Sequence, residues 1–303
     1  MLSIQALNKT YANGVQALKN INLEIPTGLF GLLGPNGAGK SSLMRTIATL
    51  QEPDSGSIHF DQIDVLRDKE ALRRQLGYLP QDFGVYPKVS AEDLLSHFAV
   101  LKGLAQRGER KEMVEGLLRQ TNLWDARKRK LGTFSGGMRQ RFGIAQALLG
   151  APRLVIVDEP TAGLDPDERN RFLNLLAEIG EQVVVMLSTH IVEDVTDLCP
   201  RMAMIVQGEV LLQGEPQAAI DLLKSKVWRK RVSKAALPDY QQRFNVLSSR
   251  LVAGQPQINV HADSQPDDGF VQVEPDLEDV YFLKIRASQA SASGAAAGVP
   301  HVA

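Results

Sequence analysis

The stretch LFGLLGPNGAGKSSLMRTIATL, at residues 29–50, decides the fold of this chain. Its first part, LFGLLG at 29–34, is an apolar run typical of a buried strand that enters a glycine-rich loop. Its last part, SSLMRTIATL at 41–50, predicts the helix that follows. Between them, GPNGAGKS at 34–41 fits the pattern GxxxxGK(S/T), which cradles phosphate groups when it joins a strand to a helix. We therefore expect a phosphate-binding loop here rather than an ordinary strand–turn–helix connection.

Each residue type in this loop has a physical role in holding phosphates. Gly34, Gly37 and Gly39 allow backbone N–H groups to curl around phosphate oxygens. The following helix presents the positive end of its dipole, and Lys40 adds a point charge for β- and γ-phosphates. The hydroxyl of Ser41 is an oxygen ligand that suits Mg²⁺. The loop thus predicts binding of a nucleoside triphosphate together with Mg²⁺.

Two acidic residues follow a second predicted strand. LVIVDEP at 154–160 is four apolar residues that favour strands, followed by Asp158 and Glu159. Ligands bind beyond the carboxyl ends of strands in parallel sheets. Asp158 is therefore expected to hold Mg²⁺ through water, and Glu159 to orient and deprotonate an attacking water. Two acids after a strand are more often a solvated loop, so this interpretation depends on the phosphate loop at 34–41.

A third element, FSGGMRQR at 134–141, predicts a helix that opens with Ser135, Gly136 and Gly137. Such a turn is a second place where backbone N–H groups can bind an anion. One nucleotide needs only one cradle, so two of them in one chain indicate a composite site across a dimer. The alternative is a plain helix cap, made by a serine and two glycines.

Composition bounds the class of protein. The 303 residues are 44% hydrophobic and 23% charged, as in globular proteins, and their length suggests about two domains. The net charge of −1 argues against nucleic acid as a partner, because binders of nucleic acid are usually basic. A single cysteine, Cys199, excludes an internal disulfide and a four-cysteine zinc site. Apolar runs are short and no signal peptide is visible, so we expect a soluble, cytosolic chain.

Alternating strand and helix patterns predict an α/β fold with a largely parallel sheet. Strand patterns lie in residues 1–30 and at 56–60, 76–79, 154–157 and 183–187, and a hairpin at 202–213. Apolar residues at helical spacing predict an inserted helical subdomain at about 89–134.

The expected domains are a first domain at 1–223, a small α/β accessory domain at 224–286 and a disordered tail at 287–303. The composition changes past the first domain, to a basic stretch, short strand-like pieces and a terminal amphipathic helix. The tail consists almost entirely of small residues that cannot bury enough surface to fold.

From residue 2 to 222 the sequence resembles the ATP-binding cassette family, the ATPase subunits of ABC transporters. Its motifs stand in family order: GPNGAGKS, Gln81 in YLPQDFGVYP, FSGGM as the family signature, LVIVDEP with Glu159, AGLDP at 162–166 with Asp165, and STH ending in His190. Tyr11 falls where the family stacks an aromatic ring on adenine. Phe134 and Met138 replace the usual leucine and glutamine of the signature, which leaves its serine and glycine donors in place.

The resemblance implies a P-loop NTPase core of the ABC ATPase type, with an N-terminal antiparallel β subdomain, an inserted helical subdomain and a small C-terminal α/β extension. It implies ATP and Mg²⁺ as cofactors. Carried over residue by residue, the catalytic side chains are Glu159, His190 and Gln81. The ATP-contacting residues are Tyr11, Gly34, Pro35, Asn36, Gly37, Ala38, Gly39, Lys40, Ser41, Ser42, Ser135, Gly136, Gly137 and Asp165. The metal-binding residues are Ser41, Gln81 and Asp158.

The function expected from this resemblance is ATP hydrolysis that powers a membrane transporter through head-to-tail dimerisation. The ending EPDLEDVYF at 274–282 resembles ATPases of exporters whose permeases are separate chains. The expected partners are an identical second ATPase subunit and transmembrane permease subunits, with the chain peripheral at the cytoplasmic face of the membrane. Two alternatives remain: a soluble cassette ATPase in an assembly process such as iron–sulfur cluster building, and a P-loop kinase outside this family, which the signature and AGLDP disfavour.

Overall fold

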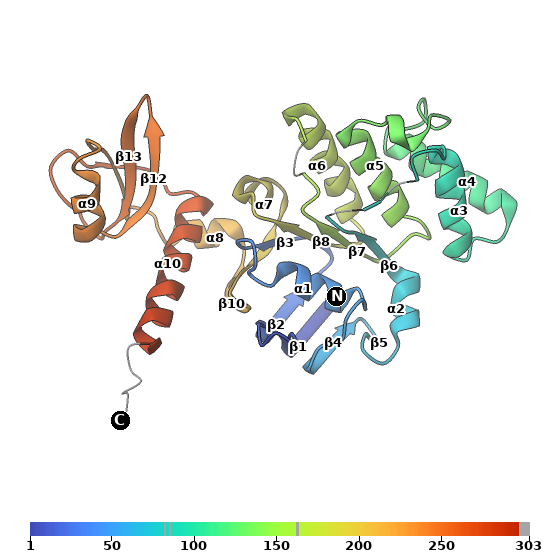
Figure 1. Cartoon of the computed structure of the whole chain (residues 1–303), viewed down its shortest axis with the longest axis horizontal. Helices are drawn as coiled ribbons and strands as arrows, with labels where there is room; N and C mark the ends of the chain where they lie inside the picture. The colour runs from blue at the N-terminus through green and yellow to red at the C-terminus, as the bar shows by residue number, and fades with distance from the viewer. Residues whose placement is uncertain (82, 85, 162–163, 297–303) are drawn as a thin grey trace. The chain divides into compact units, whose positions relative to one another are not determined.

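The computed structural model describes residues 1–81, 83–84, 86–161 and 164–296. The chain divides into two compact units, Met1–Gln213 and Gly214–Ala303 (Figure 1). The division falls earlier than the boundary expected after residue 223, because the short helix α8 (Pro216–Asp221) packs against the last helix, α10 (Leu277–Ala296). None of the described helices is long and apolar enough to cross a membrane.

The first unit is built on a six-stranded sheet in the order β10-β9-β3-β8-β7-β6. Its strands are β3 (Gly28–Leu33), β6 (Leu76–Leu79), β7 (Leu154–Asp158), β8 (Val184–Thr189), β9 (Arg201–Val206) and β10 (Glu209–Gly214). The five strands from β9 to β6 run parallel, and every residue of β7 and β8 is buried. Their continuous apolar runs are what a parallel sheet covered on both faces requires.

A smaller antiparallel sheet, in the order β2-β1-β4-β5, forms the predicted N-terminal β subdomain. Its strands are β1 (Leu2–Thr10), β2 (Gln16–Ile25), β4 (Ser55–Phe60) and β5 (Ile63–Asp64), followed by helix α2 (Lys69–Gln75). Helix α1 (Lys40–Ile47) contacts both β2 and β7, so it lies between the two sheets (Figure 1). One continuous apolar core joins both sheets and α1, which fixes the start of α1 against the parallel strands.

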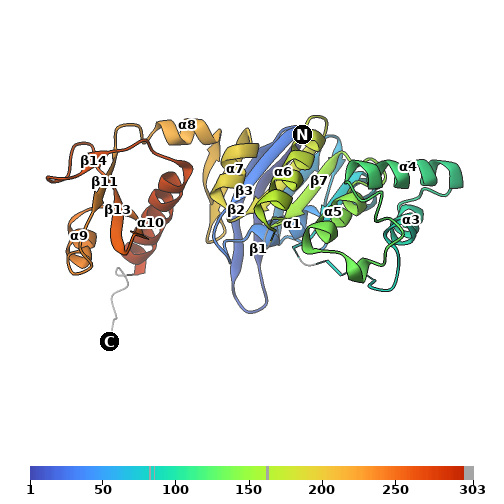
Figure 2. The same cartoon turned by 90° about the horizontal axis from the view of Figure 1, so that it is seen from above.

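Helices complete the first unit. Helices α6 (Pro166–Gly180) and α7 (Val192–Leu198) pack on β3 and β8. The inserted helical subdomain contains α3 (Ala91–Leu101), α4 (Arg107–Gln120) and the 3₁₀ turn Leu131–Thr133, and α5 (Gly136–Ala147) returns from it to the edge strand β6 (Figure 2). A bridge between Ser90 and Lys130 closes the base of the insertion.

The described part of the second unit contains a four-stranded sheet in the order β12-β13-β11-β14 and three helices. Its further elements are β11 (Val227–Arg231), α9 (Leu237–Arg243), β12 (Val246–Val252), β13 (Gln255–His261) and β14 (Val271–Gln272). Val232 after β11, apolar residues of β12 and β13, and Phe270 form its core, and Trp228, Leu237, Tyr240 and Phe244 pack against it. The fold class expected from the sequence, an α/β P-loop core with an α/β extension, is confirmed.

Residues of the motif EPDLEDVYF form hydrogen bonds that cap the start of α10 and anchor it to β13. The Oδ1 atom of Asp276 accepts a hydrogen bond from the backbone N–H of Asp279, at 2.9 Å, and caps the helix. The buried Asp279 in turn accepts a hydrogen bond from the amide of Asn259 on β13, at 2.9 Å. Helix α10 continues through Ala296, so residues 287–296 of the expected disordered tail are helical, as alanine-rich sequence favours. Residues 297–303 of that tail lie outside the described residues.

Candidate nucleotide-binding site

The phosphate loop is held in a tight conformation by close backbone approaches. Gly39, at the start of α1, has φ 109°, and a Cβ there would lie 2.4 Å from the carbonyl oxygen of Ala17. A Cβ on Gly34 would lie 2.2 Å from the carbonyl oxygen of Ile205. Both positions therefore require glycine, the first for its left-handed backbone and the second for space. The backbone of the loop therefore faces the space over the N-terminus of α1.

Lys40 is almost fully buried beneath the loop. Its ammonium donates hydrogen bonds to the carbonyl oxygens of Gly34, at 2.6 Å, and Pro35, at 3.2 Å. The ammonium also lies 3.5 Å from Oε1 of Glu159. Burial lowers the pKa of Lys40, and the neighbouring carboxylates oppose this effect. Gly34 and Pro35 therefore contribute to the site by orienting Lys40.

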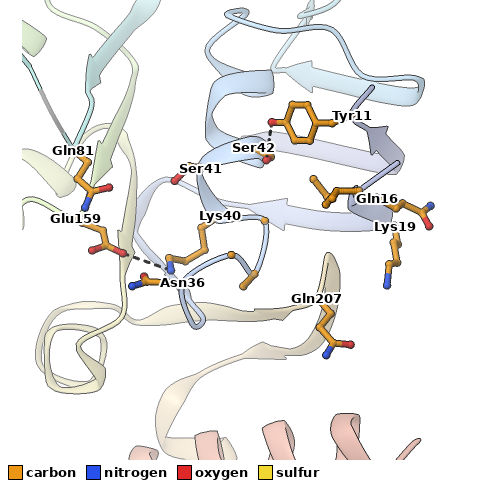
Figure 3. A pocket seen from close by; sticks show the side chains of 15 residues that line it. Tyr11, Gln16, Lys19, Asn36, Lys40, Ser41, Ser42, Gln81, Glu159 and Gln207 are labelled. Atoms are coloured by element: carbon orange, nitrogen blue, oxygen red, sulfur yellow. Dashed lines mark hydrogen bonds and ion pairs between the residues drawn. The ribbon is translucent and has the colours of Figure 1, made fainter. Parts of the chain in front are cut away.

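A cavity of about 740 Å³ opens over the loop (Figure 3). The sequence-predicted residues that line it are Tyr11, Asn36, Gly37, Ala38, Gly39, Lys40, Ser41, Ser42, Gln81 and Glu159. Gln81 and Glu159 stand to one side of Lys40 and Tyr11 to the other (Figure 3). The Tyr11 hydroxyl shares a hydrogen bond with Oγ of Ser42, at 2.9 Å, and the residue is 38% exposed. The cavity therefore offers a cationic, N–H-rich end and an aromatic end.

Asp158 ends β7 beside the loop and is 4% exposed. Burial raises the pKa of this carboxyl, and the nearby hydroxyls of Ser188 and Ser41 oppose the rise. Among the described residues, Oδ1 of Asp158 has no hydrogen-bond partner. No group of three or more His, Cys, Asp or Glu side chains in the described ranges could hold a metal alone. One buried carboxylate beside a serine hydroxyl nevertheless fits Mg²⁺, which takes one or two carboxylates together with substrate phosphates.

Glu159 and His190 are brought together although 31 residues separate them. Nδ1 of His190 lies 2.9 Å from Oε2 of Glu159, and the imidazole is about half exposed. Glu159 has φ 47°, and its backbone N–H donates to the carbonyl oxygen of Ser188 at 2.9 Å. The carboxylate thus has one oxygen toward Lys40 and the other toward His190, at the rim of the cavity.

The remaining predicted residues lie away from this cavity. Ser135, Gly136 and Gly137 open α5, where Oγ of Ser135 accepts a hydrogen bond from the N–H of Met138 at 3.1 Å. Asp165 caps α6 by accepting from the N–H of Glu168 at 2.8 Å. Neither segment lines the cavity in the described part of the chain. Ala162 and Gly163 of AGLDP, and Asp82 and Val85 of the segment after Gln81, lie outside the described residues.

The structure adds lining residues that sequence reasoning missed. Val15, Gln16, Ala17, Lys19 and Gln207 also line the cavity. Gln16 and Lys19 lie on the same side of Lys40 as Tyr11 (Figure 3). The turn after Gln207 clamps the loop, because the N–H of Gly208 donates to Ala38 and its carbonyl oxygen accepts from Lys19, both at 2.8 Å. The turn itself was visible in the sequence, but its contact with the phosphate loop depends on the packing of β9 and β10.

This geometry defines a P-loop nucleotide-binding protein, with a glycine loop and buried lysine between β3 and α1 and an acid at the carboxyl end of a nearby parallel strand. The family model for ABC transporters matches residues 18–162. YxlF of Bacillus subtilis, an uncharacterised ABC transporter ATP-binding protein, is 37% identical over 218 residues, 72% of each chain. DrrA of Streptomyces peucetius, a daunorubicin and doxorubicin resistance ATP-binding protein, is 34% identical over 88% of this chain and 78% of its own length.

Among solved structures, the dimeric ATP-binding cassette MJ0796, in a post-hydrolysis state with ADP and Pi, has a TM-score of 0.65 and 28% identity. It covers 71% of this chain, which in turn covers 98% of the cassette. The chain therefore belongs to the family of ABC transporter ATP-binding proteins, and it is an ATPase. This membership excludes the alternative of a P-loop kinase outside the family.

Proposed function

We propose that this chain hydrolyses ATP to power export by a membrane ABC transporter, through ATP-driven head-to-tail pairing of two ATPase subunits. The observation that carries the pairing is the separation of the two anion-binding segments. The phosphate loop lines the cavity, whereas Ser135 to Gly137 do not. The solved MJ0796 cassette is a dimer, which supports the same arrangement here. The proposed site is therefore completed by Ser135, Gly136, Gly137 and Asp165 of the opposite chain.

In this proposal the nucleotide lies along the cavity with adenine against the ring of Tyr11 and the phosphates over the loop. The residues that hold it are Asn36 to Ser42, with Lys40 as the cation, oriented by the carbonyl oxygens of Gly34 and Pro35. Ser41, Gln81 and Asp158 would hold Mg²⁺, which neutralises phosphate charge when bound. Glu159 orients and deprotonates the attacking water, and His190 contacts the reacting phosphate. The contact between Glu159 and His190 supports their action as a pair.

An exposed apolar groove supports docking of a separate transmembrane subunit. The groove has a volume of about 420 Å³ and lies between the helical subdomain and the core. It includes Tyr78, Phe98 and Leu101, and the side chains of Leu50 and Leu101 are 53% and 70% exposed. Exposed apolar surface of this kind marks partner sites. With this contact the chain would sit peripherally at the cytoplasmic face of the membrane.

The two aromatic residues that follow Gln81, Phe83 and Tyr86, differ in their surroundings. A Cβ on Gly143 of α5 would lie 2.7 Å from Cζ of Phe83, so Phe83 packs inward against α5. Tyr86 is 63% exposed and is free to face a partner. Of these two aromatic residues near Gln81, the packing of Phe83 leaves Tyr86 as the candidate docking contact.

Export is inferred from relatives that are named for resistance to antibiotics, DrrA among them. LnrL of Bacillus subtilis, a linearmycin resistance ATP-binding protein, is 36% identical over 71% of this chain. The identical partner subunit is inferred because closed two-fold symmetry is the commonest arrangement of such pairs. A soluble assembly ATPase is the alternative function, and no specific feature of the site favours it.

The test is Glu159→Gln, which keeps the shape of the side chain and removes its basicity. We expect ATP to bind normally, turnover to fall about 10²–10⁴-fold, and an ATP-dependent dimer to accumulate on a sizing column. Glu193→Gln, which changes an exposed acid of α7, should behave as the parent chain. Parent turnover in Glu159→Gln would refute the role of Glu159. Lost turnover without any dimer would refute the paired mechanism and leave the base assignment standing.

A further inference from the structure

A fully buried carboxylate, Asp194, joins three segments that each carry a proposed site residue. Asp194 is the third residue of α7 and is 0% exposed. Its Oδ2 accepts hydrogen bonds from the hydroxyls of Thr161, at 2.7 Å, and Thr189, at 3.3 Å. Its Oδ1 accepts a hydrogen bond from Nε of Arg169 at 2.8 Å, and the ion pair with the same guanidinium brings Nη2 to 2.6 Å from Oδ1. Every one of these partners is itself buried or half-buried.

The partners of Asp194 stand next to the reacting groups in the chain. Thr161 follows Glu159 by two residues, and Thr189 directly precedes His190. The hydroxyl of Thr189 also accepts from the N–H of Ile191 at 2.9 Å, which closes the turn that presents His190. Arg169 lies in the first turns of α6, after its cap Asp165. One carboxylate therefore ties the ends of two strands and the start of one helix.

We propose that Asp194 is a positioning residue for ATP hydrolysis, which sets the Glu159–His190 pair through the hydroxyls of Thr161 and Thr189. Asp194 does not line the cavity over the phosphate loop, and it acts by holding the two segments on either side of the 2.9 Å contact between Glu159 and His190. Arg169 neutralises its charge, which a buried carboxylate requires. The inference rests on the proposed roles of Glu159 and His190.

Asp194 can affect the rate because catalysis tolerates little displacement of the reacting groups. Displacement of a catalytic group by about 1 Å can cost about 10²-fold in rate, even when the change lies outside the reacting groups. Glu159 is buried, but His190 is about half exposed, so packing alone restrains the imidazole weakly. Hydrogen bonds from buried hydroxyls to a buried carboxylate supply the missing restraint.

The direct test is Thr161→Val, which keeps shape and removes the hydroxyl. We expect kcat to fall about 10- to 100-fold while KM and the Kd for ATP stay within about twofold. Thr161→Ser restores the hydroxyl and should restore kcat. Thr196→Val, on the exposed face of α7, is the matched control and should leave all three constants unchanged. Equal kcat in Thr161→Val and the parent chain would overturn the proposal, as would failure of Thr161→Ser to restore it.

A second measurement separates positioning from general destabilisation. In a Glu159→Gln background the pair can no longer deliver a base, so adding Thr161→Val should change the residual single-turnover rate by less than about threefold. A further loss as large as that in the parent chain would show that Thr161 acts elsewhere and would overturn the inference. Should Glu159→Gln alone keep full turnover, the proposed role of Glu159 fails first, and the two failures are thus distinguishable.

Discussion

Burial works against both charges beside the phosphate loop. Lys40 and Asp158 are 5% and 4% exposed, and burial lowers the pKa of the first and raises that of the second. The charge of Lys40 is stabilised by loop carbonyl oxygens and by Glu159. In contrast, Oδ1 of Asp158 has no hydrogen-bond partner in the described ranges. When Asp158 is ionised, its buried and incompletely paired carboxylate destabilises the nucleotide-free chain. Such a carboxylate suits a site that binds a cation.

Asp158→Asn is therefore expected to raise the melting temperature of the nucleotide-free chain at pH 7 by a few degrees. The folded-state pKa of Asp158 lies above its ordinary value of 3.8, so ionisation costs stability at neutral pH. That cost disappears as the pH falls through the folded-state pKa, and the difference between variant and parent should shrink with it. Thermal unfolding at several pH values measures this effect.

Asp197→Asn, at an exposed position of α7, is the control and should show no such pH-dependent gain. The variant Asp158→Asn should also lose the added stabilisation that Mg²⁺ confers on the ATP-bound parent chain. A lower melting temperature for Asp158→Asn at neutral pH would contradict our account of the site.

Helix α5 connects the proposed partner-facing turn with the interior of the same chain. Ser135 caps it, and a Cβ on Gly137 would lie 2.4 Å from the carboxyl carbon of Glu168, so any side chain there would displace Glu168. Toward its other end, Gly143 receives the ring of Phe83. The helix therefore presents its N-terminus outward while its neighbours hold it in place.

Ser135→Asp separates capping from the proposed trans contact. Aspartate caps helices as well as serine does, so the melting temperature should be kept. Its negative charge would oppose a phosphate held by the partner, so hydrolysis should fall about 100-fold or more while each chain binds ATP normally. Ser233→Asp makes the same change at a turn of the second unit, where Oγ of Ser233 accepts from the N–H of Ala236, and should keep activity. Undiminished hydrolysis in Ser135→Asp would exclude this turn from the reacting site.

The groove beside α3 yields a prediction about docking. Leu101→Asp changes a side chain that is 70% exposed, so the stability and basal ATPase activity of the free subunit should stay unchanged. Burying the new charge in an apolar contact should weaken co-purification with the transmembrane subunit at least about tenfold. Leu251→Asp, at 66% exposure in the second unit, is the matched control. Normal co-purification and transport in Leu101→Asp would place docking elsewhere.

At the scale of the whole molecule, the boundary between the units determines which truncations fold. Ala219, Ile220 and Leu223 are each less than 9% exposed, and α8 packs against α10. A chain that ends at residue 223 keeps these apolar side chains without α10, whereas one that ends at Gln213 removes them as well. The two truncations therefore differ in how much apolar surface they expose, although their ends are close together in the sequence.

We expect residues 1–213 to form a monodisperse unit that binds ATP with the Kd of the full chain, because the whole cavity lies within them. Residues 1–223 should bind ATP too, but expose apolar surface that a hydrophobic dye detects and that promotes aggregation. Size exclusion, dye fluorescence and ATP titration compare the two chains. Aggregation of the shorter chain alone would mean that the second unit stabilises the first.

Local sequence determined the phosphate loop, its strand and helix, and the acids at the end of β7. These features follow from contiguous residues, since glycine placement sets the backbone of the loop and apolar runs mark buried strands. Alternating strand and helix patterns likewise predicted the α/β core, and helical spacing predicted the insertion. The family resemblance implied the antiparallel subdomain, and the structure contains all three.

Tertiary structure alone decided the contacts between distant residues. It brought His190 to Glu159, joined Asp194 to Thr161 and Arg169, and turned Phe83 inward. It also moved the boundary of the units to Gln213, because α8 finds its apolar partner in α10. Such contacts depend on how whole elements pack around a shared core, and no local propensity or spacing in the chain encodes that packing by itself.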